Sequence, residues 1–169
     1  MNDFPKDVKL AQQGDSQAFA RLYALVYKDM YHIALYSLRN SHDACDAVSD
    51  AVLDAFSSIG NLRDENAFRK WIFKILTVKI KNYQAEYYSD TEDLNEINEP
   101  VEEFDYEKAE LGQALDSLDP QSRLILSMSV LEGYTSEEIS KICSLKSGSV
   151  RSRLKRIKER LKLELAEKF

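Results

Sequence analysis

The sequence predicts an all-α protein made of two small helical domains joined by an acidic linker, with a helix-turn-helix in the C-terminal domain. Five glycines and three prolines among 169 residues leave few turns, which favours long helices over strands. Apolar residues recur at helical steps along most of the chain. We expect the domains to cover residues 1–86 and 113–169, with the linker over residues 87–112.

The first two helices are separated by a glycine. A short helix over residues 7–13 is expected to stop at Gly14, because glycine is unfavourable inside a helix. Ser16 is then a candidate cap for a long second helix. The apolar residues of that helix fall at helical steps: Phe19, Leu22, Tyr23, Val26, Tyr27, Met30, Ile33, Ala34 and Leu38.

The third helix is expected to carry an acidic face beside a face of small apolar residues. After a turn at residues 40–42, Asp43 can cap a helix that runs through Phe56. Alanines and valines alternate there with Asp46, Ser49 and Asp50, and small side chains suit close helix packing. No basic residue lies nearby in the sequence to pair with the acids. The face is therefore either a solvated surface or a surface for a partner.

A loop over residues 57–63 precedes the fourth helix, which is predicted to begin at about Asp64. Its aromatic and apolar residues have basic neighbours, among them Arg69, Lys70, Lys74 and Lys79. Aromatic rings among cations suit stacking on unpaired bases while the cations hold the backbone. Trp71 fits this role and fits equally an ordinary place in the core.

The acidity of the chain comes from one segment. Residues 86–112 hold eleven acidic residues and one basic residue, a net charge of −10 in a chain whose overall charge is −6. This composition predicts a linker with at most a short helix from Asp105. Beyond it, Asp119 and Pro120 indicate a helix start, and Gly133 indicates its end.

The stretch from Thr135 to Leu163 is typical of a helix-turn-helix. Thr135 and Glu138 have the spacing of a capping box, and a second helix is predicted to begin near Lys146 or Ser147. Between Lys146 and Lys162 there are eight basic residues and one acidic residue, a net charge of +7. A basic helix behind a tight turn is how a recognition helix reaches phosphates and base edges of DNA. The apolar stripe of this helix is formed by Val150, Leu154, Ile157 and Leu161.

Several function classes find no support in the sequence. Cys45 and Cys143 are expected to be small core residues, and His32 and His42 have no metal-ligand spacing with them, so no metal or cofactor is predicted. A phosphate-binding loop and a nucleophile motif are absent, so we do not expect an enzyme. The N-terminus lacks an export signal and no window reaches the length of a membrane span, which predicts a cytoplasmic protein without a membrane segment.

Two stretches together resemble one known family. Residues 115–161, LDSLDPQSRLILSMSVLEGYTSEEISKICSLKSGSVRSRLKRIKERL, resemble region four of bacterial RNA polymerase sigma factors of the extracytoplasmic-function group. GDSQAFARLYALVYKDMYHIALYSL and DACDAVSDAVLDAF resemble region two of the same factors. NAFRKWIFKI resembles the run beside their minus-ten recognition helix. The resemblance covers about three quarters of the chain, in the family's order.

The resemblance implies three groups of binding residues. The C-terminal helix would bind the minus-thirty-five promoter element through Lys146, Ser147, Ser149, Arg151, Ser152, Arg153, Lys155 and Arg156. The minus-ten element would be bound by Asn61, Arg63, Arg69, Lys70, Trp71, Lys74 and Lys79, with a flipped base held in the loop over residues 57–63. Core RNA polymerase would be bound by Asp43, Asp46, Ser49, Asp50 and Leu53.

The sequence departs from the family pattern at a few positions. Ser49 and Val52 replace the usual Gln and Phe of the polymerase-binding helix, and residues 76–85 hold fewer cations than usual. Ser144 replaces the customary turn glycine. Lys146 stands at the usual serine cap, so Ser147 is the alternative cap.

The leading hypothesis is therefore a sigma factor that binds core RNA polymerase and promoter DNA. The alternative is a helix-turn-helix transcriptional regulator that binds duplex DNA without core polymerase. The two differ in one property, because a sigma factor needs the core enzyme to bind promoters stably. The sequence leaves open whether an anti-sigma factor also binds the protein.

Overall fold

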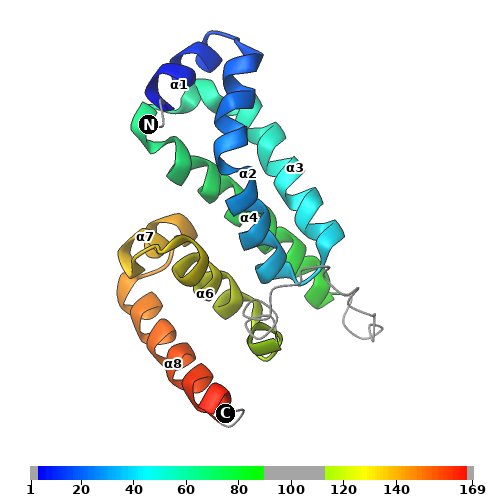
Figure 1. Ribbon diagram of the computed structural model, residues 1–169, viewed down its shortest axis with the longest axis vertical. Helices are drawn as coiled ribbons and strands as arrows, with labels where there is room; N and C mark the ends of the chain where they lie inside the picture. Colours follow the sequence, from blue (N-terminus) through cyan, green and yellow to red (C-terminus); the bar gives the residue numbers. More distant parts are fainter. Residues whose placement is uncertain (1–3, 90–112, 167–169) are drawn as a thin grey trace.

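The computed structural model describes residues 4–89 and 113–166, and within these ranges it is all-α, as the sequence predicts. We call residues 4–89 the N-terminal half and residues 113–166 the C-terminal half. Figure 1 shows α1 to α4 in one bundle, with α6 and α7 against it and α8 packed on α6 and α7. The short helix expected from Asp105 lies outside the described residues.

The N-terminal half consists of four α-helices: α1 (Phe4–Gln12), α2 (Ser16–Leu38), α3 (Ser41–Ser58) and α4 (Phe68–Ser89). Helix α2 packs against α1, α3 and α4, and therefore forms the centre of this bundle. The alanines expected to allow close packing of α3 are buried, including Ala44, Ala47 and Ala51 at 0% exposure.

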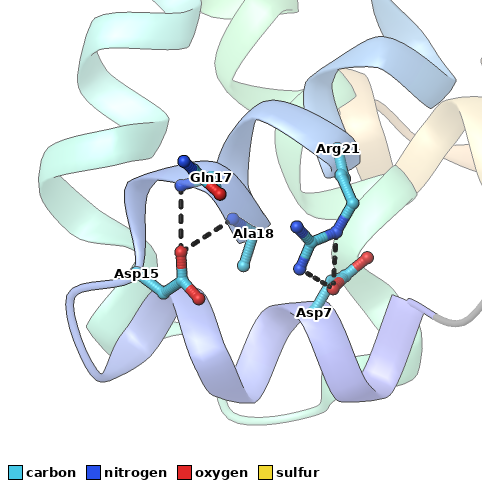
Figure 2. Close-up of polar contacts among 5 residues, drawn as sticks. All are labelled: Asp7, Asp15, Gln17, Ala18 and Arg21. Carbon is cyan, nitrogen blue, oxygen red and sulfur yellow. Dashed lines mark hydrogen bonds and ion pairs between the residues drawn. The ribbon is translucent and has the colours of Figure 1, made fainter.

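Two predicted helix caps are wrong by one to three residues. The cap of α2 is Asp15, whose carboxylate accepts from the backbone N–H groups of Gln17 and Ala18 at 3.0 and 3.1 Å (Figure 2). The cap of α3 is Asn40, whose side chain accepts from Asp43 N–H at 3.0 Å. In both places an earlier short polar residue has the extended backbone that a cap requires, so Ser16 lies inside its helix, as does Asp43.

The connection between α3 and α4 is more regular than the predicted loop. Helix α3 continues to Ser58 and is followed by the 3-10 turns η1 (Ile59–Asn61) and η2 (Glu65–Ala67). Asp64 caps η2 by accepting from Asn66 N–H at 3.0 Å, and α4 begins only at Phe68. We call residues 57–63, from the last two residues of α3 through η1 to Arg63, the α3–α4 loop.

The C-terminal half follows the predicted boundaries closely. Helix α6 (Pro120–Glu132) is capped by Asp119 and ends at Gly133, which has a left-handed backbone with φ 68°. Helix α7 (Ser136–Cys143) is capped by Thr135, whose hydroxyl accepts from Glu138 N–H at 3.2 Å. These three predictions are confirmed.

The turn of the helix-turn-helix differs from prediction in one detail. Ser144 adopts the left-handed conformation, with φ 56°, that glycine adopts more easily. Helix α8 (Ser147–Ala166) begins at Ser147, and its first backbone hydrogen bond joins Val150 N–H to Lys146 C=O at 3.1 Å. Lys146 therefore holds the cap position, and the prediction that Ser147 caps the helix is wrong.

The two halves share a hydrophobic core. One cluster of buried residues includes Phe73 and Ile80 of α4 together with Ile125 of α6 and Ile139 of α7. Helix α2 packs against α6, and α4 packs against α7. The Phe73 and Tyr134 rings meet edge to face, with centroids 6.1 Å apart. The apolar faces that sequence analysis assigned to separate domains therefore cover one another.

Candidate nucleic-acid interface

Helix α8 presents its cations to solvent because its apolar stripe packs against α6 and α7. Val150 is 0% exposed, and Leu154 and Ile157 are also buried. Of the residues predicted to read the minus-thirty-five element, the exposed ones are Lys146, Ser149, Arg151, Ser152, Lys155 and Arg156. Ser147 and Arg153 are partly buried. Most of the predicted group thus shares one accessible surface at the start of a helix.

Arg153 differs from its neighbours because its guanidinium contacts α6. It donates to the side-chain oxygen of Gln121, and it lies 3.7 Å from the Asp119 carboxylate. Desolvation raises the pKa of Asp119, but hydrogen bonds from Ser122 and the charge of Arg153 outweigh it and leave the pKa below its ordinary value. Arg153 therefore orients α8 on the start of α6.

The residues predicted to bind the minus-ten element lie on α4 and the α3–α4 loop. Asn61, Arg63, Lys70 and Lys74 are exposed. Trp71 is partly buried and packs against the core, with its ring centroid 6.1 Å from that of Phe68. It therefore contributes to the core and still has accessible surface.

Arg69 is held at the boundary between the two halves. Its guanidinium donates to Asp29 of α2 at 2.8 Å and to Glu132 of α6, and it lies 5.0 Å from the centre of the Phe73 ring. The Glu132 side chain is only 6% exposed. Burial raises the pKa of Glu132, although Arg69 acts in the opposite direction. We call Arg69, Asp29 and Glu132 the inter-half ion cluster.

Lys79 of this group also has a charged partner, because its ammonium lies 2.6 Å from Asp54 of α3. Tyr83 of α4 also donates to the Asp50 carboxylate at 3.3 Å. Partial burial and the nearby charges of Asp50 and Asp46 raise the pKa of Tyr83 to about 12. The acidic face of α3, which has no basic residue nearby in the sequence, therefore receives a basic partner from α4.

The residues predicted to bind core polymerase form one surface of α3. Asp46, Ser49, Asp50 and Leu53 are exposed, and Asp43 is partly exposed. Leu53 is 67% exposed, and Phe56, one turn further along, is 51% exposed. Large apolar side chains left in solvent beside carboxylates are typical of a surface that a partner protein covers.

Gln12 is a residue that the sequence analysis did not identify. It is the last residue of α1, and its side-chain amide donates to the backbone carbonyls of Ile59 at 3.0 Å and Leu62 at 2.9 Å. Both carbonyls belong to the α3–α4 loop. The sequence carries no signal for this contact, because the partners lie 47 and 50 residues away.

Within residues 4–89 and 113–166, no three His, Cys, Asp or Glu side chains are grouped so that they could hold a metal ion. None of the helices in the described part of the chain combines the length and the apolar composition that crossing a membrane requires.

Comparison with known families finds two matches in chain order. Residues 22–86 match the model for sigma-70 region 2, and residues 108–161 match the model for sigma-70 region 4. The first match covers α3 and most of α2 and α4. The second covers α6, α7 and most of α8.

Individual proteins of known function are similar over most of the chain. The RNA polymerase sigma-H factor of Pseudomonas aeruginosa is 25% identical, over 90% of this chain and 88% of its own length. The ECF RNA polymerase sigma-E factor of Haemophilus influenzae is 27% identical, over 90% of this chain and 89% of its own length.

Two solved structures are similar in fold. CnrH in complex with the cytosolic domain of CnrY has a TM-score of 0.74 and 21% identity, covering 98% of this chain and 99% of CnrH. The sigma factor RpoE of Bartonella quintana in complex with the anti-sigma factor NepR has a TM-score of 0.72 and 20% identity. That match covers 88% of this chain and 96% of RpoE.

Proposed function

This chain belongs to the extracytoplasmic-function group of the sigma-70 family, and from that membership we infer that it is a sigma factor, which binds core RNA polymerase and directs promoter-specific transcription initiation. The observation that carries this conclusion is the pair of region 2 and region 4 matches, in order, across both halves. Members of this family are not enzymes. We propose that this chain likewise has no catalysis of its own and acts in the cytoplasm, where the polymerase works.

We propose one binding partner for each of three exposed surfaces. The exposed cations of α8 are assigned to the minus-thirty-five element. The exposed residues of the α3–α4 loop and of α4 are assigned to the minus-ten element, and the exposed acids of α3 with Leu53 are assigned to core polymerase. The accessibility of these side chains in the described residues supports the assignment.

Reconstituted transcription distinguishes a sigma factor from a conventional helix-turn-helix regulator, which the comparisons do not favour. The chain should start transcription at specific promoters in a genomic fragment library only when core polymerase is added. It should bind the same promoters weakly by itself. Stable binding to duplex DNA without core enzyme, and no transcription with it, would restore the regulator hypothesis.

The closed arrangement of the halves has to open for this function. The minus-ten and minus-thirty-five elements lie roughly 25 base pairs apart, or about 85 Å along the duplex. A compact chain of this length has a radius of gyration of about 15 Å. Arg69, assigned to one element, is bound to Glu132 of the half assigned to the other. We propose that the halves separate on core polymerase.

An anti-sigma factor is a further proposed partner. RpoE of Bartonella quintana, which has a similar fold, was solved in complex with the anti-sigma factor NepR. The likeness supports the fold alone. We propose that a partner of this class binds the present chain off polymerase and keeps it from core enzyme.

Exposed arginines of α8 are expected to select promoters. Replacing Arg151 or Arg156 with alanine should cost about 1–3 kcal/mol if the side chain reads a base, and should relax preference at that position. A residue that contacts only phosphate should weaken all promoters alike. Transcription from a promoter library with single-base changes measures both effects. Lys162→Ala, which removes the same charge further along α8, is the matched control, and unchanged promoter use in both arginine variants would refute the assignment of this helix.

The acidic surface of α3 is expected to govern binding to core polymerase. Asp50→Lys should weaken core binding about tenfold or more, because a like charge facing a basic partner costs several kcal/mol. It should leave the fold intact, since an exposed carboxylate contributes little to stability. Pull-down with core enzyme and circular dichroism measure the two effects. Glu159→Lys makes the same charge change on exposed α8, and equal core binding by both variants and the parent would leave the α3 acids as a solvated surface.

A further inference from the structure

Gln12 joins the first helix to the loop that is assigned to strand opening. The two N–H groups of its side-chain amide donate to the carbonyls of Ile59 and Leu62, at 3.0 and 2.9 Å. These two residues lie on either side of Gly60 and Asn61, so a single amide spans the turn η1. The turn is closed on itself by a bond of 3.1 Å from Leu62 N–H to Ile59 C=O.

The loop has an inner and an outer side. Ile59 and Leu62 are buried, at 5% and 8% exposure, while Gly60, Asn61 and Arg63 are exposed. The buried side chains and the amide of Gln12 hold the loop from within. The residues assigned to the flipped nucleobase and its phosphate therefore point outward from a loop whose inner side is held in place.

Helix α1 is a firm support because it is attached independently of Gln12. Arg21 of α2 donates to Asp7 at 2.8 Å, as Figure 2 shows. Val8 is 0% exposed, and the Phe4 ring packs against Phe68 with centroids 5.7 Å apart. Loss of the Gln12 amide should consequently loosen the loop without detaching α1.

We propose that Gln12 is a positioning residue for promoter opening. By fixing the carbonyls of Ile59 and Leu62, it keeps the α3–α4 loop in the shape that receives an extruded base, so no ordering of the loop is required when the strands separate. A preorganised site binds more tightly than one that must be ordered on binding. This inference rests on the proposed function of the loop and extends it to a residue on another helix, which does not itself contact DNA.

The test compares Gln12→Met with Gln12→Lys in the full chain, reconstituted with core polymerase. Methionine keeps the length of the side chain and removes both donors, whereas lysine restores donors at a similar reach. Gln13→Met and Gln13→Lys, at the exposed neighbouring position, are the matched controls. Permanganate reactivity of minus-ten thymines measures opening, and gel shift of the closed complex measures promoter binding.

We expect Gln12→Met to lower permanganate reactivity by about 5- to 150-fold, the factor that corresponds to the two hydrogen bonds it loses, at unchanged closed-complex occupancy. Gln12→Lys should recover most of the reactivity, and both Gln13 variants should match their parent. Parental reactivity of Gln12→Met would overturn the inference. A parallel fall in melting temperature and core binding would also overturn it, since the role would then be structural.

A loop variant separates failure of this inference from failure of the proposed function. Asn61→Ala with Arg63→Ala is tested on the same promoter. If that double variant opens the promoter normally, the loop has no role in opening and the proposed site is wrong. If the double variant is defective and Gln12→Met is not, the site stands and only the positioning role of Gln12 is lost.

Discussion

Replacing Glu132 with lysine should separate the two halves of the chain. Glu132 is nearly buried and faces the guanidinium of Arg69, so the variant would place two cations side by side at the inter-half ion cluster. The cost should be about 1–3 kcal/mol, less than for a fully buried pair, because Arg69 keeps some solvent contact and its bond to Asp29. Since the cluster lies on the boundary between α4 and α6, the change should mainly destabilise the closed arrangement of the halves relative to the open one.

Small-angle scattering and circular dichroism measure this effect. The radius of gyration should rise above the roughly 15 Å expected for a compact chain of this length, while the helix content stays close to that of the parent. Glu137→Lys, an exposed acid in the first turn of α7, is the matched control and should remain closed. A compact Glu132→Lys variant with parental stability would show that the cluster does not hold the halves together.

Removing the two polar side chains of the α3–α4 loop should block promoter opening more than promoter binding. Extruding a base costs a few kcal/mol, which the loop has to return through hydrogen bonds and stacking. Asn61 and Arg63 are exposed and can supply these contacts. We therefore expect Asn61→Ala with Arg63→Ala to reduce opening by about 5- to 150-fold, which corresponds to 1–3 kcal/mol.

Permanganate footprinting measures this second effect, and a premelted promoter provides its control. With unpaired minus-ten bases already present in the template, the double variant should approach the activity of the parent. Lys6→Ala removes an exposed charge from α1 and should open both templates normally. Equal reactivity of the double variant and the parent on duplex promoter would move the opening function to α4.

Local features of the fold were predictable because the residues that cause them are neighbours in the chain. Asp119 and Pro120 begin a helix, Gly133 ends it and Thr135 begins the next, and each acts within one helical turn. The caps of α2 and α3 were misplaced because several short polar residues compete there. The choice between them depends on which residue has the extended backbone, and composition does not reveal that.

Contacts between distant elements were not predictable in the same way. An apolar stripe on α4 has the same sequence pattern whether its own half or the other half covers it. The partners of Arg69 lie 40 and 63 residues away, so nothing in the sequence distinguishes it from the freely exposed Lys70 beside it. The sequence therefore predicted which residue types form the candidate site. It did not predict the hydrogen bonds and ion pairs within the site, because these depend on how distant helices pack.

The shared core also affects how this factor competes for polymerase. If only open molecules bind core enzyme, the apparent dissociation constant equals the intrinsic one divided by the open fraction. A closed arrangement favoured by about 3 kcal/mol leaves fewer than about one molecule in a hundred open. Contacts across the boundary between the halves, such as that of Phe73 with Tyr134, then lower the share of a limited polymerase pool that this factor captures, although both residues are buried in the closed form.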